Sequence, residues 1–399
     1  MHILVGETAL RALRASRYRG LAVALPETTP PQALAYLPSQ TRDKEREADE
    51  EFEPGMETLE TSGFRFERVE ANAKVDLWRL GDVGTFGRDR PLELGVFESA
   101  RARRRLKSRT RVLSRNLPEA ALIEVSPHLY FEGPELILIH MASQTDAVRL
   151  AQIIMELCGT YSPCPAPDDN GWTRTLYDLP PVTTIERICA YARHVRQRGG
   201  KAVLQEALRL AAEGAASPAE TILALVMSLP REMGGYGFPM PSLNAKLTVP
   251  DEERDMVGGE AYYLDAFWQD AYADLEYEST EFHLDPLVAA SLVATRDNPK
   301  EGSPYATWRR ERITKADADR RRMRDLQLLG LQVIPVTSFD LHSVRRLDQV
   351  AQALARRFEQ AAGHDMDAWQ ADLEEKTWRE ARRKLLQALQ PDETILDWA

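Results

Sequence analysis

The chain of 399 residues is 43% hydrophobic and 28% charged, a composition typical of globular proteins and unlike that of disordered or fibrous ones. Domains usually have about 100 to 200 residues, so the length predicts two or three of them. The formal charge is −11. This charge argues against a protein that coats nucleic acid with its whole surface, but it leaves room for a local basic cleft, because binding follows the local arrangement of charge.

Neither a membrane span nor a disulfide framework is expected. No run approaches the about 18 to 20 consecutive apolar residues that a bilayer span needs, and the first residues lack the pattern of a secretory signal. The cysteines, Cys158, Cys164 and Cys189, are too few for a disulfide framework and lack the further ligands of a structural zinc site. We therefore expect a cytoplasmic protein with no membrane partner.

The first part of the chain is predicted to be an α/β region, at 1–133. Alternating residues at 64–69 and 92–97 indicate short strands, and two more strands, at 122–125 and 129–131, flank a turn. Residues 134–214 are different, because their apolar residues follow the helical period. Three helices are predicted there, each ended by glycine, at 136–158, 184–198 and 202–213.

Two charged segments interrupt the α/β region. Residues 43–60 are rich in acids with almost no apolar spacing, which predicts a solvated loop. Residues 101–115 contain eight Lys and Arg and no acid, so their like charges repel one another. A polyanion such as nucleic acid would relieve this repulsion, and a plain solvated face is the alternative. The binding candidates in this segment are Arg103, Arg104 and Arg105.

Residues 215–362 are predicted to form a second α/β domain, with a charged helical tail at 363–399. Ser217 at the N-cap and Pro218 at the first helical position open its first helix. Three strands, a helix, a strand and a helix are predicted to follow, at 243–249, 261–268, 272–278, 315–329, 331–337 and 344–362. Because a helix crosses over to the last strand, that strand must run parallel to an earlier one, and we expect the strand at 272–278.

Carboxylates gather on these strands. Asp274, Glu276 and Glu278 alternate with apolar residues and therefore lie on one face of their strand, and Asp265 lies on the neighbouring strand. Clustered carboxylates repel one another, and a hard cation such as Mg²⁺, which prefers oxygen ligands, relieves the repulsion. The alternative is an acidic side of an antiparallel strand that faces solvent.

The order of residues in this domain resembles the PD-(D/E)XK nuclease superfamily. The branch in question is similar to very-short-patch-repair endonucleases and occurs in antitoxin-like proteins of the type IV abortive-infection class. The matching residues are Asp265, Glu276, Phe282-His283 and Asp319-x-x-Arg322-x-x-x-Leu326-x-x-x-Gly330-x-x-Val333, with Ser217-Pro-x-Glu220 and Asn244 upstream. The sequence departs from the pattern at Glu278 and Ser279, where the branch usually has Asp-Gly, and it lacks the lysine of the wider superfamily there.

This resemblance implies a restriction-endonuclease-like mixed sheet flanked by helices, and Mg²⁺-dependent (or Mn²⁺-dependent) hydrolysis of phosphodiesters in bacterial defence or DNA repair. Asp265 and Glu276 would be metal ligands, with Glu220 as an outer ligand. Glu278 would orient the attacking water, and His283 would act as a general acid or base or hold a phosphate. For Arg322, an ion pair with Asp319 one helical turn away is expected.

Residues 286–314 are longer than the usual link and are therefore predicted to be an insertion. If they form a flap over the carboxylates, Arg309, Arg310 and Arg312 would border the site and bind nucleic acid, with DNA favoured. The resemblance also implies a cognate toxin protein as a partner. Two alternatives to a nuclease stay open: a catalytically inactive antitoxin or regulator that binds nucleic acid on the same fold, and a structural scaffold.

Overall fold

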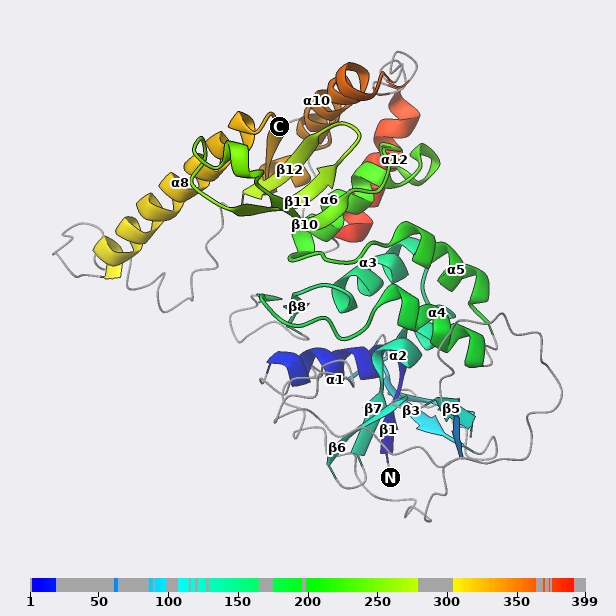
Figure 1. Cartoon of the computed structure of the whole chain (residues 1–399). Helices are drawn as coiled ribbons and strands as arrows, with labels where there is room; N and C mark the ends of the chain where they lie inside the picture. Colours follow the sequence, from blue (N-terminus) through cyan, green and yellow to red (C-terminus); the bar gives the residue numbers. More distant parts are fainter. Residues whose placement is uncertain are drawn as a thin grey trace. The chain divides into compact units, whose positions relative to one another are not determined.

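The chain folds into two compact units, Met1–Glu213 and Gly214–Ala399, which are described separately (Figure 1). The structure is a computed structural model, and both units combine helices with mixed sheets, as the predicted α/β class requires. It describes residues 2–18, 61–63, 86–88, 90–97, 107–114, 116–118, 121–126, 129–164, 175–195, 199–278, 304–363, 369, 373 and 375–390.

The first unit is built on a five-stranded sheet in the order β4-β3-β1-β7-β6. Its central strand pairs antiparallel with β3 and parallel with β7. The strands are β1 (His2–Leu4), β3 (Leu92–Val96), β4 (Ser108–Val112), β6 (Leu122–Ser126) and β7 (Leu129–Glu132). Two small sheets pair β2 (Thr61–Gly63) with β5 (Asn116–Pro118) and β8 (Ser162–Pro163) with β9 (Thr175–Leu176). The predicted strands at 92–97, 122–125 and 129–131 are confirmed.

The helices of the first unit are α1 (Gly6–Tyr18), α2 (Pro134–Met141), α3 (Ala147–Leu157), α4 (Ile185–His194) and α5 (Lys201–Leu210). The prediction of one helix over 136–158 is wrong, because the chain forms α2 and α3 there. The break is fixed by Asp146, whose carboxylate accepts the N–H of Arg149 at 2.8 Å and so caps α3. The predicted strand at 64–69 and the acidic loop at 43–60 lie outside the described residues.

The second unit has the element order α-β-β-β-α-β-α that the sequence predicts. These elements are α6 (Pro218–Ser228), β10 (Ser242–Thr248), β11 (Ala261–Trp268), β12 (Ala273–Glu278), α8 (Pro304–Leu328), β13 (Gln332–Thr337) and α10 (Val344–Ala362). The sheet order is β10-β11-β12-β13. The first three strands are antiparallel, and β13 is parallel to β12, with Asp274 opposite Val333. The predicted parallel pairing is therefore confirmed.

Shorter elements complete the second unit: η4 (Arg231–Met233), η5 (Asp251–Glu253), α9 (Ser338–Leu341) and, near the end of the described chain, α12 (Lys376–Leu389). An apolar cluster joins α8 to the sheet, because Leu326 and Leu329 pack with Tyr262, Leu264 and Val333. This packing fixes where the last turns of α8 lie on the sheet.

The crossover helix α8 begins earlier than predicted. It starts at Pro304, not at Lys315, so the segment assigned to the end of an insertion is helical. Proline fits at this place because a first helical position needs no N–H donor. The rest of the predicted insertion, 286–303, lies outside the described residues. Of the helices that the structure describes, none is long and apolar enough to cross a bilayer.

Candidate functional site

The second sheet forks between β11 and β12. Their ladder ends at the pair Ala266 and Leu275. Beyond this pair, β11 continues beside β10, with Leu264 opposite Ala245, while β12 continues beside β13, with Glu276 opposite Pro335. We call this place the carboxylate fork, because Asp265, Asp274 and Glu276 lie around it. Backbone groups at a fork lose their neighbouring strand and need other partners.

Two aspartates supply such partners across the fork. The N–H of Tyr277 on β12 donates to Asp265 Oδ2 at 2.8 Å. In the opposite direction, the N–H of Ala266 on β11 donates to Asp274 Oδ1 at 3.0 Å. The side chains thus replace the ladder where the strands separate, and each aspartate is fixed in position by a backbone N–H.

Glu276 is held by an arginine from α8. Arg322 donates through Nη2 to Glu276 Oε1 at 2.7 Å and through Nη1 to Glu276 Oε2. The same Nη2 also donates to the carbonyl oxygen of Tyr263 on β11. The expectation that Arg322 pairs with Asp319 is therefore wrong: Asp319 is exposed, and the guanidinium turns toward the sheet, where a buried carboxylate is a better partner than a solvated one.

Glu220 reaches the same neighbourhood from α6. The N–H of Glu220 donates to Ser217 Oγ at 3.1 Å, and its carboxylate accepts the N–H of Ala216 at 2.8 Å, so the predicted N-cap is confirmed. Glu220 is buried, with 6% of the residue exposed. Burial, followed by repulsion from Asp265, raises the pKa of Glu220 to about 7. The charge of Glu276 contributes to this increase as well.

The other acids at the fork show the same effect. Burial and then the charge of Glu276 raise the pKa of Asp265 to about 6, and Arg322 opposes the increase. Burial, followed by the closeness of Glu276, raises the pKa of Asp274 to about 10. Asp274 is fully buried, and its Oδ2 has no hydrogen-bond partner among the described residues. The fork is therefore short of positive charge, even with Arg322 in place.

The chemistry of these ligands fits a hard divalent cation, since all four are carboxylates and the unpartnered Asp274 Oδ2 lies among them. The residues that would hold it are Asp265, Glu276 and Glu220. Within the described part of the chain, no three Asp, Glu, His or Cys side chains are already grouped as metal ligands. Arg322 explains part of this, because it uses both oxygens of Glu276.

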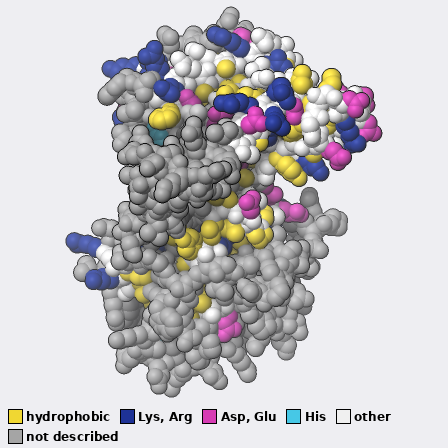
Figure 2. Space-filling model, turned by 90° about the vertical axis from the view of Figure 1, so that its left-hand side faces the viewer, with side chains coloured by type: hydrophobic (Ala, Val, Ile, Leu, Met, Phe, Trp, Pro, Cys, Tyr) yellow, Lys and Arg dark blue, Asp and Glu magenta, His cyan; other side chains and the backbone are white. Residues whose placement is uncertain are grey.

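The remaining predicted residues are less directly related to the fork. Glu278 belongs to β12 but is exposed. His283 and the segment with Arg103, Arg104 and Arg105 lie outside the described residues. The backbone of 309–312 belongs to the first turns of α8, so these residues do not form a flap; the side chains of Arg309, Arg310 and Arg312 are outside the description. Among the described residues on the face seen in Figure 2, basic and acidic side chains stand side by side.

The sequence analysis missed two contributors to the site. Asp274 was placed on the acidic face but given no role; in the structure Ala273, Asp274 and Leu275 are all buried, so the strand is enclosed on both faces, which alternation alone does not indicate. The role of Arg322 had no local signal, because its partner lies 46 residues away.

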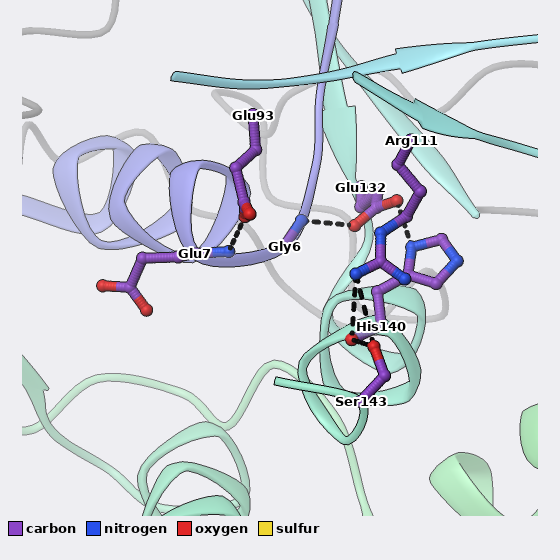
Figure 3. A network of polar contacts seen from close by, with 7 residues as sticks. All are labelled: Gly6, Glu7, Glu93, Arg111, Glu132, His140 and Ser143. Atoms are coloured by element: carbon purple, nitrogen blue, oxygen red, sulfur yellow. Dashed lines mark hydrogen bonds and ion pairs between the residues drawn. The ribbon is translucent and has the colours of Figure 1, made fainter. Parts of the chain in front are cut away.

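The first unit contains a separate polar network at the start of α1 (Figure 3). The N–H groups of Gly6 and Glu7 donate to Glu132 Oε2 at 2.8 Å and Glu93 Oε2 at 3.0 Å. The other oxygen of Glu132 lies 2.5 Å from His140 Nδ1. Carboxylates are favourable at a helix N-terminus, where unpaired N–H groups carry partial positive charge. The network therefore anchors α1 to β3 and β7.

Arg111 on β4 extends this network. Its Nη2 donates to the carbonyl oxygen of His140 and to Ser143 Oγ, both at 3.4 Å. One member of the basic segment 101–115 thus turns inward, while Arg109 is exposed.

Comparisons of the chain with protein-family models, with curated proteins and with solved structures give no match. The function must therefore be argued from the two units themselves.

Proposed function

We propose that the second unit is an Mg²⁺-dependent (or Mn²⁺-dependent) nuclease domain that hydrolyses phosphodiester bonds. The observation that carries the proposal is that Asp265 and Glu276 flank a fork in a mixed sheet, while Glu220 on α6 lies near enough for their charges to raise its pKa. The order α6-β10-β11-β12-α8-β13, with β13 parallel to β12, is also the order expected of a restriction-endonuclease-like core. A solvent-facing acidic strand would not bury its acids, yet Asp274 and Glu276 are buried.

In this proposal, the side chains of the protein hold the cation and orient the attacking water. A bound divalent cation would supply charge neutralisation at the phosphate and a water of lowered pKa. Asp265 and Glu276 would hold it, and their carboxyl groups come from the two strands that diverge at the fork. Glu220 would be an outer ligand, contributed by α6. Glu278, which is exposed at the end of β12, would orient the attacking water.

The substrate class proposed is nucleic acid, with DNA favoured, in a bacterial defence or DNA-repair setting, and a cognate toxin is the proposed protein partner. A polyanion approaching four carboxylates needs basic groups nearby. Arg320 and Arg324 on α8 are exposed near Arg322 in the sequence and are candidates for this role. Arg309, Arg310 and Arg312 on α8 stay proposed contacts to nucleic acid, and Arg103, Arg104 and Arg105 of the first unit are proposed as a separate contact.

The second candidate is a catalytically inactive module that binds nucleic acid on the same fold. The specific observation that favours it is the pairing of Arg322 with both oxygens of Glu276, because this pairing already supplies a positive charge to a proposed metal ligand. Such a module would keep the exposed arginines of α8 and would bind nucleic acid without divalent cations.

Nuclease assays on labelled plasmid and single-stranded substrates test the proposal. The wild type should cleave with Mg²⁺ or Mn²⁺ and not with excess chelator. Asp265→Asn and Glu276→Gln should each lower the cleavage rate by roughly a hundredfold or more. Asp319→Asn is the matched control, because Asp319 is an exposed acid on α8. Full activity of Asp265→Asn would overturn the nuclease proposal. Binding without cleavage by the wild type would support the inactive module.

A further inference from the structure

Arg322 bridges the two strands at the place where their ladder has ended. It contacts β11 through the carbonyl oxygen of Tyr263 and β12 through both oxygens of Glu276. A guanidinium has five N–H donors in a planar arrangement, which matches the two oxygens of a carboxylate. Arg322 therefore closes the fork and also provides the acids with a counter-ion.

A divalent cation at the fork would need the same carboxylate. In a bidentate pair, each oxygen of Glu276 directs a lone pair at one N–H of Arg322. A cation shared with Asp265 has to approach Glu276 through one of these oxygens, and it would bring two positive charges next to the guanidinium. Repulsion between them is strong because Glu276 is buried, where water screens charges poorly.

Arg322 is more exposed than the carboxylate that it binds. Its side chain is 33% exposed, whereas that of Glu276 is 9% exposed. The helix is held to the sheet by other residues, Leu326 and Leu329, which are 0% and 8% exposed in the apolar cluster. The guanidinium therefore has a route to solvent while α8 stays packed.

We propose that Arg322 is the built-in competitor of the divalent cation, so that it must release Glu276 before Asp265 and Glu276 can share a metal ion. This inference rests on the proposed metal site, and it adds a residue that controls access to the site. Arg322 is a positioning residue in this scheme, because it acts through Glu276. The metal-free state is closed by Arg322, and the metal-bound state is open at the same position.

The test is a calorimetric Mn²⁺ titration, together with melting temperatures, of the full-length wild type and Arg322→Gln. Arg321→Gln is the matched control, because Arg321 pairs with Asp317 on the exposed side of α8. Arg322→Lys keeps one charge without the bidentate geometry and serves if Arg322→Gln is poorly folded. Asp265→Ala reports whether Mn²⁺ binds at the fork.

Without metal, Arg322→Gln should melt roughly 5 to 15 °C below the wild type, because it leaves a buried carboxylate without its partner. With metal, its Mn²⁺ affinity should be about tenfold higher or more, since charge-assisted hydrogen bonds no longer compete. Arg322→Lys should lie between the two proteins. Arg321→Gln should match the wild type in both measurements.

The possible results separate this inference from the proposed function. If the wild type binds Mn²⁺ through Asp265 and Arg322→Gln binds it equally or more weakly, the competition is refuted while the metal site stands. If only Arg322→Gln binds, the competition is supported, and the wild type is a closed module without metal. If neither protein binds Mn²⁺, although the cluster of Arg322→Gln is even more negative, both the competition and the metal site are refuted.

Discussion

Asp348 on α10 and Arg382 on α12 form an ion pair of 3.1 Å in which the two side chains are only 7% and 3% exposed. The hydroxyl of Tyr236 donates to the same carboxylate at 2.7 Å, and the guanidinium lies 5.0 Å from the centre of the Tyr236 ring. Arg382 also donates to the carbonyl oxygen of Leu373 at 2.5 Å. The C-terminal helix is thus an integral part of the second unit.

Breaking this pair should destabilise the second unit strongly. Arg382→Met removes the buried charge and leaves Asp348 with only the longer pair of 3.6 Å to the partly exposed Arg379. Removing one partner of a buried ion pair typically costs about 3 to 5 kcal/mol. Arg383→Gln is the control, because Arg383 pairs with the partly exposed Glu380, and it should change the free energy of unfolding by less than about 1 kcal/mol. Urea unfolding, monitored by the hydrogen exchange of the α10 amides, measures the free energy of unfolding of both variants. A loss below 1 kcal/mol in Arg382→Met would show that α12 is not essential to the unit.

The pH dependence of the first unit should reflect Glu93. Burial raises the pKa of Glu93 above 4.5, and this outweighs the opposing N–H of Glu7 and the charge of Arg111. Between its ordinary pKa and the raised one, the folded state binds more protons than the unfolded state. Stability contributed by this group is therefore greatest at low pH and falls as the pH rises through the raised pKa.

Replacing Glu93 by glutamine tests whether stability falls as the pH rises. Glu93→Gln should flatten the decrease in stability above about pH 4.5, whereas Glu186→Gln, at an exposed position, should leave it unchanged. Native-state hydrogen exchange of the α1 amides over a pH series reads the first unit separately. A stability that rises with pH through this interval in the wild type, and not in Glu93→Gln, would contradict the assignment.

Gly6 should not tolerate a side chain. It has a φ of +56°, and a Cβ there would lie 2.5 Å from Glu93 Oε2. Gly6→Ala combines backbone strain with displacement of Glu93 from the N–H of Glu7, for which we expect a loss of about 1 to 3 kcal/mol. Gly87→Ala is the control, since a Cβ there meets nothing within 4 Å. Thermal unfolding of the two variants should separate them clearly; equal melting temperatures would contradict this account.

Asp274 should behave as a neutral group in metal-free protein. With a pKa raised to about 10 by burial and by Glu276, it is protonated near neutral pH. Asp274→Asn keeps the oxygen that accepts the N–H of Ala266, so its free energy of unfolding should lie within about 1 kcal/mol of the wild type. Asp274→Ala should lose more, about 1 to 3 kcal/mol, because that N–H is left unpaired. A large loss in the Asn variant would indicate that Asp274 is ionised.

Much of the second unit could be predicted from the sequence because its signals are local. Strand alternation located β11 and β12, and helix α10 begins and ends where its periodicity predicts, at Val344 and Ala362. The crossover rule then gave the parallel pairing of β12 and β13. The start of α8 was predicted too late, at Lys315 instead of Pro304. The resemblance implied a short link before this helix, so the residues after Pro304 were assigned to an insertion although they favour a helix.

The parts that could not be predicted depend on distant contacts. The bond from Gly6 to Glu132 joins residues 126 positions apart, and no pattern near either residue announces it. Arg322 looked like a partner for Asp319 because helical spacing favours that pair. The choice of Glu276 instead is decided by burial, which only the folded sheet provides.

Helix α8 is longer than the part of it that packs on the sheet. The helix has 25 residues, about 37 Å at the usual rise, and Figure 1 shows it extending beyond the sheet. Its last turns pack in the apolar cluster through Leu326 and Leu329, whereas the residues from Asp317 to Arg321 are exposed. Arg322 therefore lies where the exposed turns of α8 meet the packed turns, and it is at this boundary that the helix contacts Glu276.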